Sequence, residues 1–168
     1  VDLNRFNVDL DSRQNIRSKY KLENVFVIGN VARWAPIKNH ELLFRIVKNL
    51  NFLNYRLVLS GIGITHNNYE LTQLIKKYKL EESVILLGEC ENISEIMNSF
   101  DIHILTSKME GFGLVTAEAM ACGVPCLSTN VGQQKEIISD CGFVGLEKDI
   151  YSFVKYIFEF YNFTHGER

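Results

Sequence analysis

Two glutamates in one short segment are the first candidates for chemistry. Glu110 and Glu118 stand eight positions apart in SKMEGFGLVTAEAMACGVPC (107–126), and no charged residue follows Glu118 until Lys135. An unpaired carboxylate among apolar residues is energetically costly. Glu118 must therefore lie at a solvated edge of the protein, or it has a partner that this segment does not supply.

The glycines beside the first glutamate indicate an anion site. Gly111 and Gly113 allow backbone N–H groups to come close to a ligand, and a helix is expected to begin at Leu114. The N-terminus of a helix presents free N–H groups and the positive end of its dipole, which together suit a phosphate. An ordinary strand-to-helix turn would use the same glycines, so both interpretations stay open.

Two cations follow the first apolar run of the chain. Arg33 and Lys38 lie in NVARWAPIKNHELL (30–43), directly before an expected helix. An arginine fork and a lysine ammonium at a strand end can neutralise a diphosphate, although two solvated surface charges would look the same in the sequence. Gly61 and Gly63 lack the third glycine of a dinucleotide fingerprint, so NAD binding gains no support.

The elements that position these residues alternate along the chain. Apolar runs predict strands at 24–31, 55–61, 83–88, 101–107, 124–129 and 142–146. The segments between and after them predict helices at 40–50, 69–80, 93–100, 114–122, 133–139 and 150–163. Continuous apolar strands suit a parallel sheet that is covered on both faces. The fold class is therefore α/β, a Rossmann-like open parallel sheet that binds ligands at the carboxyl ends of its strands.

Composition narrows the classes of function. The chain has 168 residues, a formal charge of −2 and a pI of about 6.1, so it carries no basic field for nucleic acid. Residues 1–23 read as a polar lead-in with a helix near 12–20, followed by one domain over 24–168. Its four cysteines show no CxxC pairing, which predicts a reducing compartment such as the cytoplasm. Because the chain starts at Val1, we expect it to be part of a longer protein.

Several segments together resemble one enzyme family. SKMEGFGLVTAEAMACGVPCLSTNVG (107–132) resembles the E-x7-E signature of retaining glycosyltransferases of family four, the glycosyl transferases group 1, in the nucleotide-sugar-binding half of the GT-B fold. NVARWAPIKNHELL resembles the segment in which that family's Arg and Lys hold the donor diphosphate. VILLGECENISEIMNSFDIHILTS (84–107) and NRFNVDL (4–10) match as well, so the resemblance covers about residues 4–146 in order.

The resemblance implies a role for each matching residue. Arg33 and Lys38 would bind the diphosphate and stabilise the leaving group, Glu118 would bind the ribose, and Glu110 would contact the donor sugar near the reacting carbon. The implied catalytic residues are Glu110, Arg33 and Lys38. The implied donor-binding residues are Arg33, Lys38, Gly61, Cys90, Asn92, Glu110, Gly111, Phe112, Gly113, Leu114 and Glu118, with Cys90 and Asn92 beside the base.

This sequence departs from the family pattern at two positions. Gln133 stands where the family usually has a second glycine, and Asn39 where glycine is more frequent. Neither change removes a charged contact, but the Gln133 change leaves the contribution of its loop open. A literal D-x-D at Asp9 and Asp11 lies in the polar lead-in, so we expect it to be a chance match and no metal motif.

The implied function is the donor-binding half of a retaining glycosyltransferase. It would transfer the sugar of a UDP-, GDP- or ADP-sugar to a glycan or lipid-linked acceptor. No metal is expected, because Arg and Lys supply the positive charge. The acceptor half lies outside this chain, so we expect little transferase activity from the chain alone. The intact enzyme is expected in the cytoplasm, with peripheral association at the inner face of the cell membrane. Two alternatives stay open, a non-catalytic nucleotide-binding module and a nucleotide-sugar epimerase.

The histidines are expected to have no role in catalysis or binding. His103 alternates on an apolar strand, which predicts a packed or hydrogen-bonded side chain. His40, His66 and His165 are expected at the surface. Trp34, next to Arg33, either covers the phosphate loop or has a packing role.

Overall fold

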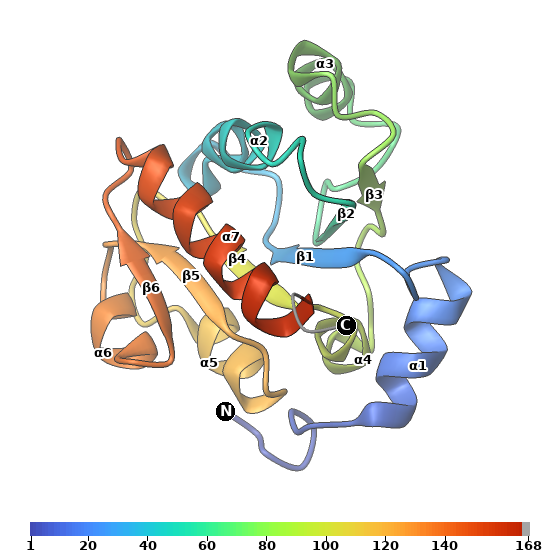
Figure 1. The fold of residues 1–168 in the computed structure, drawn as a ribbon, viewed down its shortest axis with the longest axis vertical. Coiled ribbons are helices and arrows are strands. Elements are labelled where there is room, and N and C mark those ends of the chain that lie inside the picture. The colour runs from blue at the N-terminus through green and yellow to red at the C-terminus, as the bar shows by residue number, and fades with distance from the viewer. Residues whose placement is uncertain (166–168) are drawn as a thin grey trace.

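The computed structural model describes residues 1–165 as a parallel sheet between two layers of helices (Figure 1). The six strands lie in the order β3-β2-β1-β4-β5-β6, and every neighbouring pair is parallel. The predicted Rossmann-like fold is thereby confirmed. The strands are β1 (Phe26–Val31), β2 (Tyr55–Ser60), β3 (Val84–Leu86), β4 (Ile102–Leu105), β5 (Cys126–Thr129) and β6 (Gly142–Gly145).

The helices fall close to their predicted ranges and cover both faces of the sheet. Successive strand residues face opposite layers, so Ile28 joins the core under α2, α3 and α7, while Val27 joins the core under α1, α4, α5 and α6. The helices are α1 (Leu10–Lys19), α2 (His40–Lys48), α3 (Tyr69–Tyr78), α4 (Ile93–Asn98), α5 (Leu114–Ala121), α6 (Gln134–Ile138) and α7 (Ile150–His165), with a 3₁₀ turn at Pro36–Lys38.

The start of α2 explains why asparagine can replace glycine in the loop after β1. Asn39 has φ +52° and ψ +49°, the left-handed conformation that glycine adopts freely and asparagine tolerates better than most residues. Its side chain also accepts a hydrogen bond from Leu42 N and so caps the helix. Gln133 has φ −97°, which any residue can adopt, so neither departure distorts the backbone.

The lead-in segment packs onto the domain. Phe6, Ile16 and Leu22 are buried in the same core as α4 and α5, and α1 lies beside α4 (Figure 1). Asp9 caps α1 by accepting hydrogen bonds from the backbone N–H and the hydroxyl of Ser12, and these bonds lower its pKa. The D-x-D match thus has a structural role at a helix terminus.

The switch point of the sheet lies between β1 and β4, where the strand order reverses. In open α/β sheets such a point opens a crevice beyond the carboxyl ends of the strands. Here the loops after β1, β4 and β5 are tied together, because Lys108 N donates to Ile37 O (2.8 Å) and Thr129 Oγ1 donates to Ser107 O (2.6 Å). These contacts hold the predicted site residues of the loops after β1 and β4 at one edge, next to the end of β5.

Candidate functional site

An ion pair joins the loop after β1 to the loop after β4. Lys38 Nζ lies 2.6 Å from Glu110 Oε1, and the two side chains are only 19% and 12% exposed. The hydroxyl of Ser107 donates to the same carboxylate oxygen at 2.6 Å. Oε2, the second oxygen of the Glu110 carboxylate, has no hydrogen-bond partner among the described residues.

The turn between Glu110 and α5 presents backbone donors. Gly113 has φ +80°, and the first helical hydrogen bond runs from Thr116 N to Gly113 O. The N–H groups of Gly113, Leu114 and Val115 meet no acceptor within the described part of the chain. Three free donors at the positive end of the α5 dipole form the geometry that an anion would need.

Two further charges at this edge have no partner inside the protein. Glu118 is half-buried on the second turn of α5, and it makes no hydrogen bond or ion pair with any described side chain. Its negative charge nevertheless acts on Cys122, whose pKa rises to about 11, first through burial and then through Glu118. Arg33 is exposed and is likewise unpaired within residues 1–165. The partner that Glu118 lacks in its own segment is not supplied by the rest of the described chain.

The remaining predicted donor-binding residues lie in the loops after β2 and β3. Gly61 is required at its position, because a Cβ there would lie 2.3 Å from Ala32 O at φ +146°. Its N–H donates to Gly88 O (2.7 Å) and so ties the two loops together. Cys90 is half-buried and Asn92 is exposed at the start of α4, without a side-chain cap bond. Both follow the carboxyl end of β3, in the connection that leads into α4.

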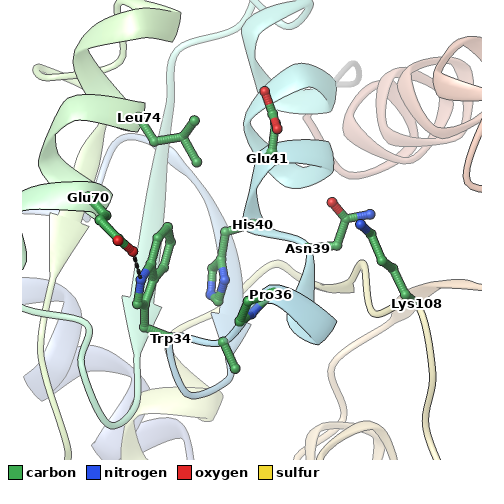
Figure 2. A pocket seen from close by; sticks show the side chains of 9 residues that line it. Trp34, Pro36, Asn39, His40, Glu41, Glu70, Leu74 and Lys108 are labelled. Atoms are coloured by element: carbon green, nitrogen blue, oxygen red, sulfur yellow. Dashed lines mark hydrogen bonds between the residues drawn. The ribbon is translucent and has the colours of Figure 1, made fainter.

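A pocket of about 260 Å³ lies on the outer side of the Lys38 loop (Figure 2). It does not contain Glu118 or the turn before α5, so it is separate from the open rim that carries the predicted anion site. Figure 2 shows the rings of Trp34 and His40 side by side in it, with centroids 5.1 Å apart, and the indole N–H directed at Glu70. Trp34 thus has a packing role here.

The prediction that His40 lies at the surface is wrong. The imidazole is 3% exposed because Trp34, from the preceding loop, covers the first turn of α2. Burial, and then the positive charge of Lys38, lowers the pKa of His40 to about 4, so the ring is neutral at physiological pH. Its Nε2 has no hydrogen-bond partner among the described residues.

The other histidines follow expectation where they can be compared. His103 is fully buried on β4 and stacks on Phe100, and its Nε2 accepts a hydrogen bond from Val31 N at 3.4 Å. Burial lowers its pKa to about 4. His66 is exposed as predicted. The side chain of His165 lies outside the described residues.

Sequence reasoning missed the polar residues behind the anion-facing turn. Gln134 is completely buried, and it hydrogen-bonds to Phe112 O and to the hydroxyl of Thr116. The stretch GQQKEII looks like a short surface helix, so its polar residues gave no signal of burial. The one signal in the sequence was the glycine at position 113. The structure explains it, because a Cβ at this position would lie 1.8 Å from Gln134 Nε2.

Two features are absent from residues 1–165. No group of three His, Cys, Asp or Glu side chains in residues 1–165 is arranged to hold a metal ion. Within the same residues, each helix is too short or too polar to cross a bilayer.

The fold and its carboxyl edge define a Rossmann-like domain of the kind that forms one half of GT-B glycosyltransferases. The chain belongs to the family described as "Glycosyl transferases group 1", which matches residues 12–162. The resemblance seen in the sequence is thereby confirmed.

Curated relatives carry this domain within much longer chains. The protein is 43% identical over 125 residues to the N-acetyl-alpha-D-glucosaminyl L-malate synthase of Bacillus anthracis, covering 73% of this chain and 32% of that protein. It is 33% identical over 124 residues to an N-acetylgalactosamine-N,N'-diacetylbacillosaminyl-diphospho-undecaprenol 4-alpha-N-acetylgalactosaminyltransferase of Campylobacter jejuni, covering 73% and 33%. The chain therefore spans about a third of the length of these relatives.

Solved structures agree with the assignment. HepE from Anabaena, in complex with UDP-glucose, superposes with a TM-score of 0.87 at 25% identity, covering 98% of this chain and 46% of HepE. A second HepE structure contains UDP and glucose, and it matches at 26% identity with a TM-score of 0.82 over 94% of this chain and 45% of HepE. Sucrose-phosphate synthase from Thermosynechococcus elongatus shares the fold at 21% identity, with a TM-score of 0.83 over 98% and 42%.

Proposed function

We propose that this chain is the donor-binding half of a retaining glycosyltransferase that transfers a sugar from a nucleoside diphosphate. The observation that carries the proposal is the set of unpaired groups at the carboxyl edge of the sheet. Glu118, Arg33 and the first N–H groups of α5 have no partner in the described chain, and a nucleoside diphosphate would supply partners of the right charge to each. HepE, which shares the fold, is described in complexes with UDP-glucose and with UDP.

Each group has a role that fits its chemistry. In this proposal the phosphate oxygens accept hydrogen bonds from the N–H groups of Gly113 and Leu114 and meet the positive charges of Arg33 and Lys38. The carboxylate of Glu118 accepts hydrogen bonds from the ribose hydroxyls, which replaces the solvation that it loses by burial. The loop that carries Cys90 receives the base.

The proposed reaction breaks the bond between the sugar's reacting carbon and the diphosphate oxygen. Negative charge then grows on the departing nucleoside diphosphate, and fixed cations and helix donors aimed at that oxygen stabilise the transition state. In this proposal Glu110 contacts the sugar through Oε2, and its contacts with Lys38 and Ser107, both made by Oε1, support that role because they leave Oε2 without a partner in the described chain. Because Lys38 and Arg33 supply the positive charge, we propose that no metal ion is needed.

The acceptor belongs to the rest of the enzyme in this proposal. The chain spans less than half of HepE, so a second half would face the carboxyl edge and bind a glycan or a lipid-linked acceptor. The name of the Campylobacter jejuni relative includes a diphospho-undecaprenol substrate, which supports a lipid-linked acceptor. Such an enzyme would work in the cytoplasm, in peripheral contact with the inner face of the membrane.

Calorimetric titration of the chain with UDP, GDP and ADP tests the proposal. We expect one diphosphate to bind, and Glu118→Ala and Arg33→Ala each to weaken binding by about tenfold or more, since a charge-assisted hydrogen bond contributes roughly 1.5–3 kcal/mol. Glu82→Ala and Arg45→Ala remove exposed charges away from this edge and serve as matched controls that should leave the affinity unchanged.

Two outcomes would contradict the proposal. If the two site variants and the two controls bind alike, the unpaired charges are not a nucleotide site. If the folded wild-type chain binds no diphosphate, the full-length protein must bind one for the proposal to stand. Turnover assays complete the test, because we expect transfer only by the full-length protein, whereas an epimerase would change the sugar without any acceptor.

A further inference from the structure

Gln134 forms a buried polar brace behind the turn that leads into α5. Its side chain is 0% exposed. Its Nε2 donates to Phe112 O at 3.3 Å, and its Oε1 accepts a hydrogen bond from Thr116 Oγ1 at 2.7 Å. The side chain thus bridges the peptide before Gly113 and the first turn of α5, although Gln134 belongs to α6.

This brace fixes the direction of one peptide group. In a planar trans peptide, the carbonyl and the N–H of the next residue point in opposite directions. Because Phe112 O is bonded to the buried amide of Gln134, the N–H of Gly113 points away from the interior. It therefore lies on the same side as the free N–H groups at the start of α5.

Without the brace, no other hydrogen bond among the described residues would hold the Phe112 carbonyl. Gly113 has the left-handed conformation at φ +80°, and a Cβ on Gly111 would meet no other atom, so the two glycines that flank Phe112 put little steric restriction on the direction of this peptide. A rotated peptide would direct Phe112 O outward and would present a partial negative charge to an anion. An apolar side chain of similar volume could fill the space that Gln134 occupies, so the particular contribution of its amide is the direction of this peptide.

We infer that Gln134 is a positioning residue, which holds the Phe112–Gly113 peptide so that the Gly113 N–H and the first N–H groups of α5 face the donor diphosphate. Thr116 supports it by fixing the amide from the other side. The inference rests on the proposed function for the identity of the anion. The orientation of the peptide can be tested without any ligand.

The test compares Gln134→Met, which keeps the volume of the side chain and removes both hydrogen bonds, with Thr116→Val, which removes only the supporting one. UDP is the probe, and calorimetry on the 168-residue chain gives its affinity. We expect Gln134→Met to weaken UDP binding about tenfold and Thr116→Val by a smaller factor, since each loses hydrogen bonds that orient the donors. Glu118→Ala in the same experiment shows whether the nucleotide site itself exists.

A second measurement separates positioning from a simple loss of stability. Amide NMR of the unliganded chain should show one sharp Gly113 resonance in the wild type. In both variants it should show a shifted or exchange-broadened one, while amides in β1 and β5 stay unchanged. A variant that is merely less stable would keep the Gly113 resonance in place. Thr116→Val provides this readout even if Gln134→Met fails to fold.

The outcomes are distinguishable. If Gln134→Met and Thr116→Val bind UDP like the wild type while Glu118→Ala binds weakly, the positioning role is overturned and the proposed function stands. An unchanged Gly113 resonance in the variants would overturn it independently. If no form of the chain, nor the full-length protein, binds UDP, GDP or ADP, both the proposed function and the role assigned to Gln134 fail.

Discussion

The carboxylates near the two ends of β4 differ in their partners within the protein. At the amino end, Asp101 is 10% exposed, and both of its oxygens accept hydrogen bonds, Oδ1 from Arg13 and Oδ2 from Arg17 and from Val27 N. Beyond the carboxyl end, Glu118 is half-buried and has no hydrogen bond or ion pair with any described residue.

This difference distinguishes Asp101, which stabilises the fold, from Glu118, which is available to bind a ligand. The Asp101 cluster ties α1 to the start of β4, and Arg13 and Arg17 also donate to the carbonyls of Asn98, Ser99 and Phe100. A buried charge with all its partners stabilises only while each partner is present. Glu118 has no partner in the described chain, which is the pattern expected of a binding residue.

The largest expected effect on stability comes from removing the charge of Asp101, whose carboxylate has all its partners. Asp101→Asn leaves two arginines without their counter-charge, and we expect the free energy of unfolding to fall by about 3 kcal/mol. Glu118→Gln is the matched change at the other end, and it should alter stability by no more than about 0.5 kcal/mol. Urea unfolding at pH 7 measures both. Equal losses in the two variants would show that Glu118 is structural and would remove the contrast.

The stability of the folded protein should fall in acid because His40 is buried as a neutral side chain. Its pKa is about 4 in the folded protein and near 6.5 when unfolded, so the unfolded chain binds more protons between these values. The resulting stability is fully present above pH 6.5 and is lost as the pH falls toward 4, by at most about 3 kcal/mol. Urea unfolding at several pH values should show this slope.

His40→Leu identifies how much of that slope belongs to this residue. We expect the variant to lose part of the pH dependence between 6.5 and 4, with the rest due to His103, whose pKa is also lowered to about 4 by burial. A slope that is identical in wild type and variant would show that His40 stays solvated and that the Trp34 cover is not formed.

The smallest effect concerns a polar residue at the carboxyl end that already has its partners. Asn39 caps α2 and donates to Glu147 Oε1 at 2.9 Å, in the left-handed conformation. Asn39→Gly should change stability by only a few tenths of a kcal/mol, because glycine favours this conformation, whereas Asn39→Ala should cost about 1 kcal/mol. Thermal unfolding compares the two. A larger loss for glycine than for alanine would contradict the conformational explanation.

Much of this architecture could be predicted from local patterns. The predicted strands and helices recur within a few residues, and the parallel sheet was expected because its apolar runs do not alternate. Arg33, Lys38, Glu110 and Glu118 could be placed at the carboxyl edge, because each follows a predicted strand in such a fold. Their types alone indicated an anion, and the family resemblance indicated which one.

Contacts between distant segments could not be predicted in this way. His40 was expected at the surface because its own helix gives no sign that Trp34 covers it. Gln134 was missed because a short polar stretch looks exposed until the turn at Phe112 packs on it. The direct pairing of Lys38 with Glu110 also depends on two loops that are far apart in the chain.

The sequence by itself determined the alternation of strands and helices, the order of the glycine-bearing loops and the identity of the charged residues. These properties follow from hydrophobic periodicity and residue type, which are local to each segment. The tertiary structure decided which charges are satisfied. Asp101 gains partners from α1 and β1, whereas Glu118 gains none from the described chain. Only the folded arrangement separates them, because hydrogen bonds and ion pairs depend on distance in space and not on distance along the chain.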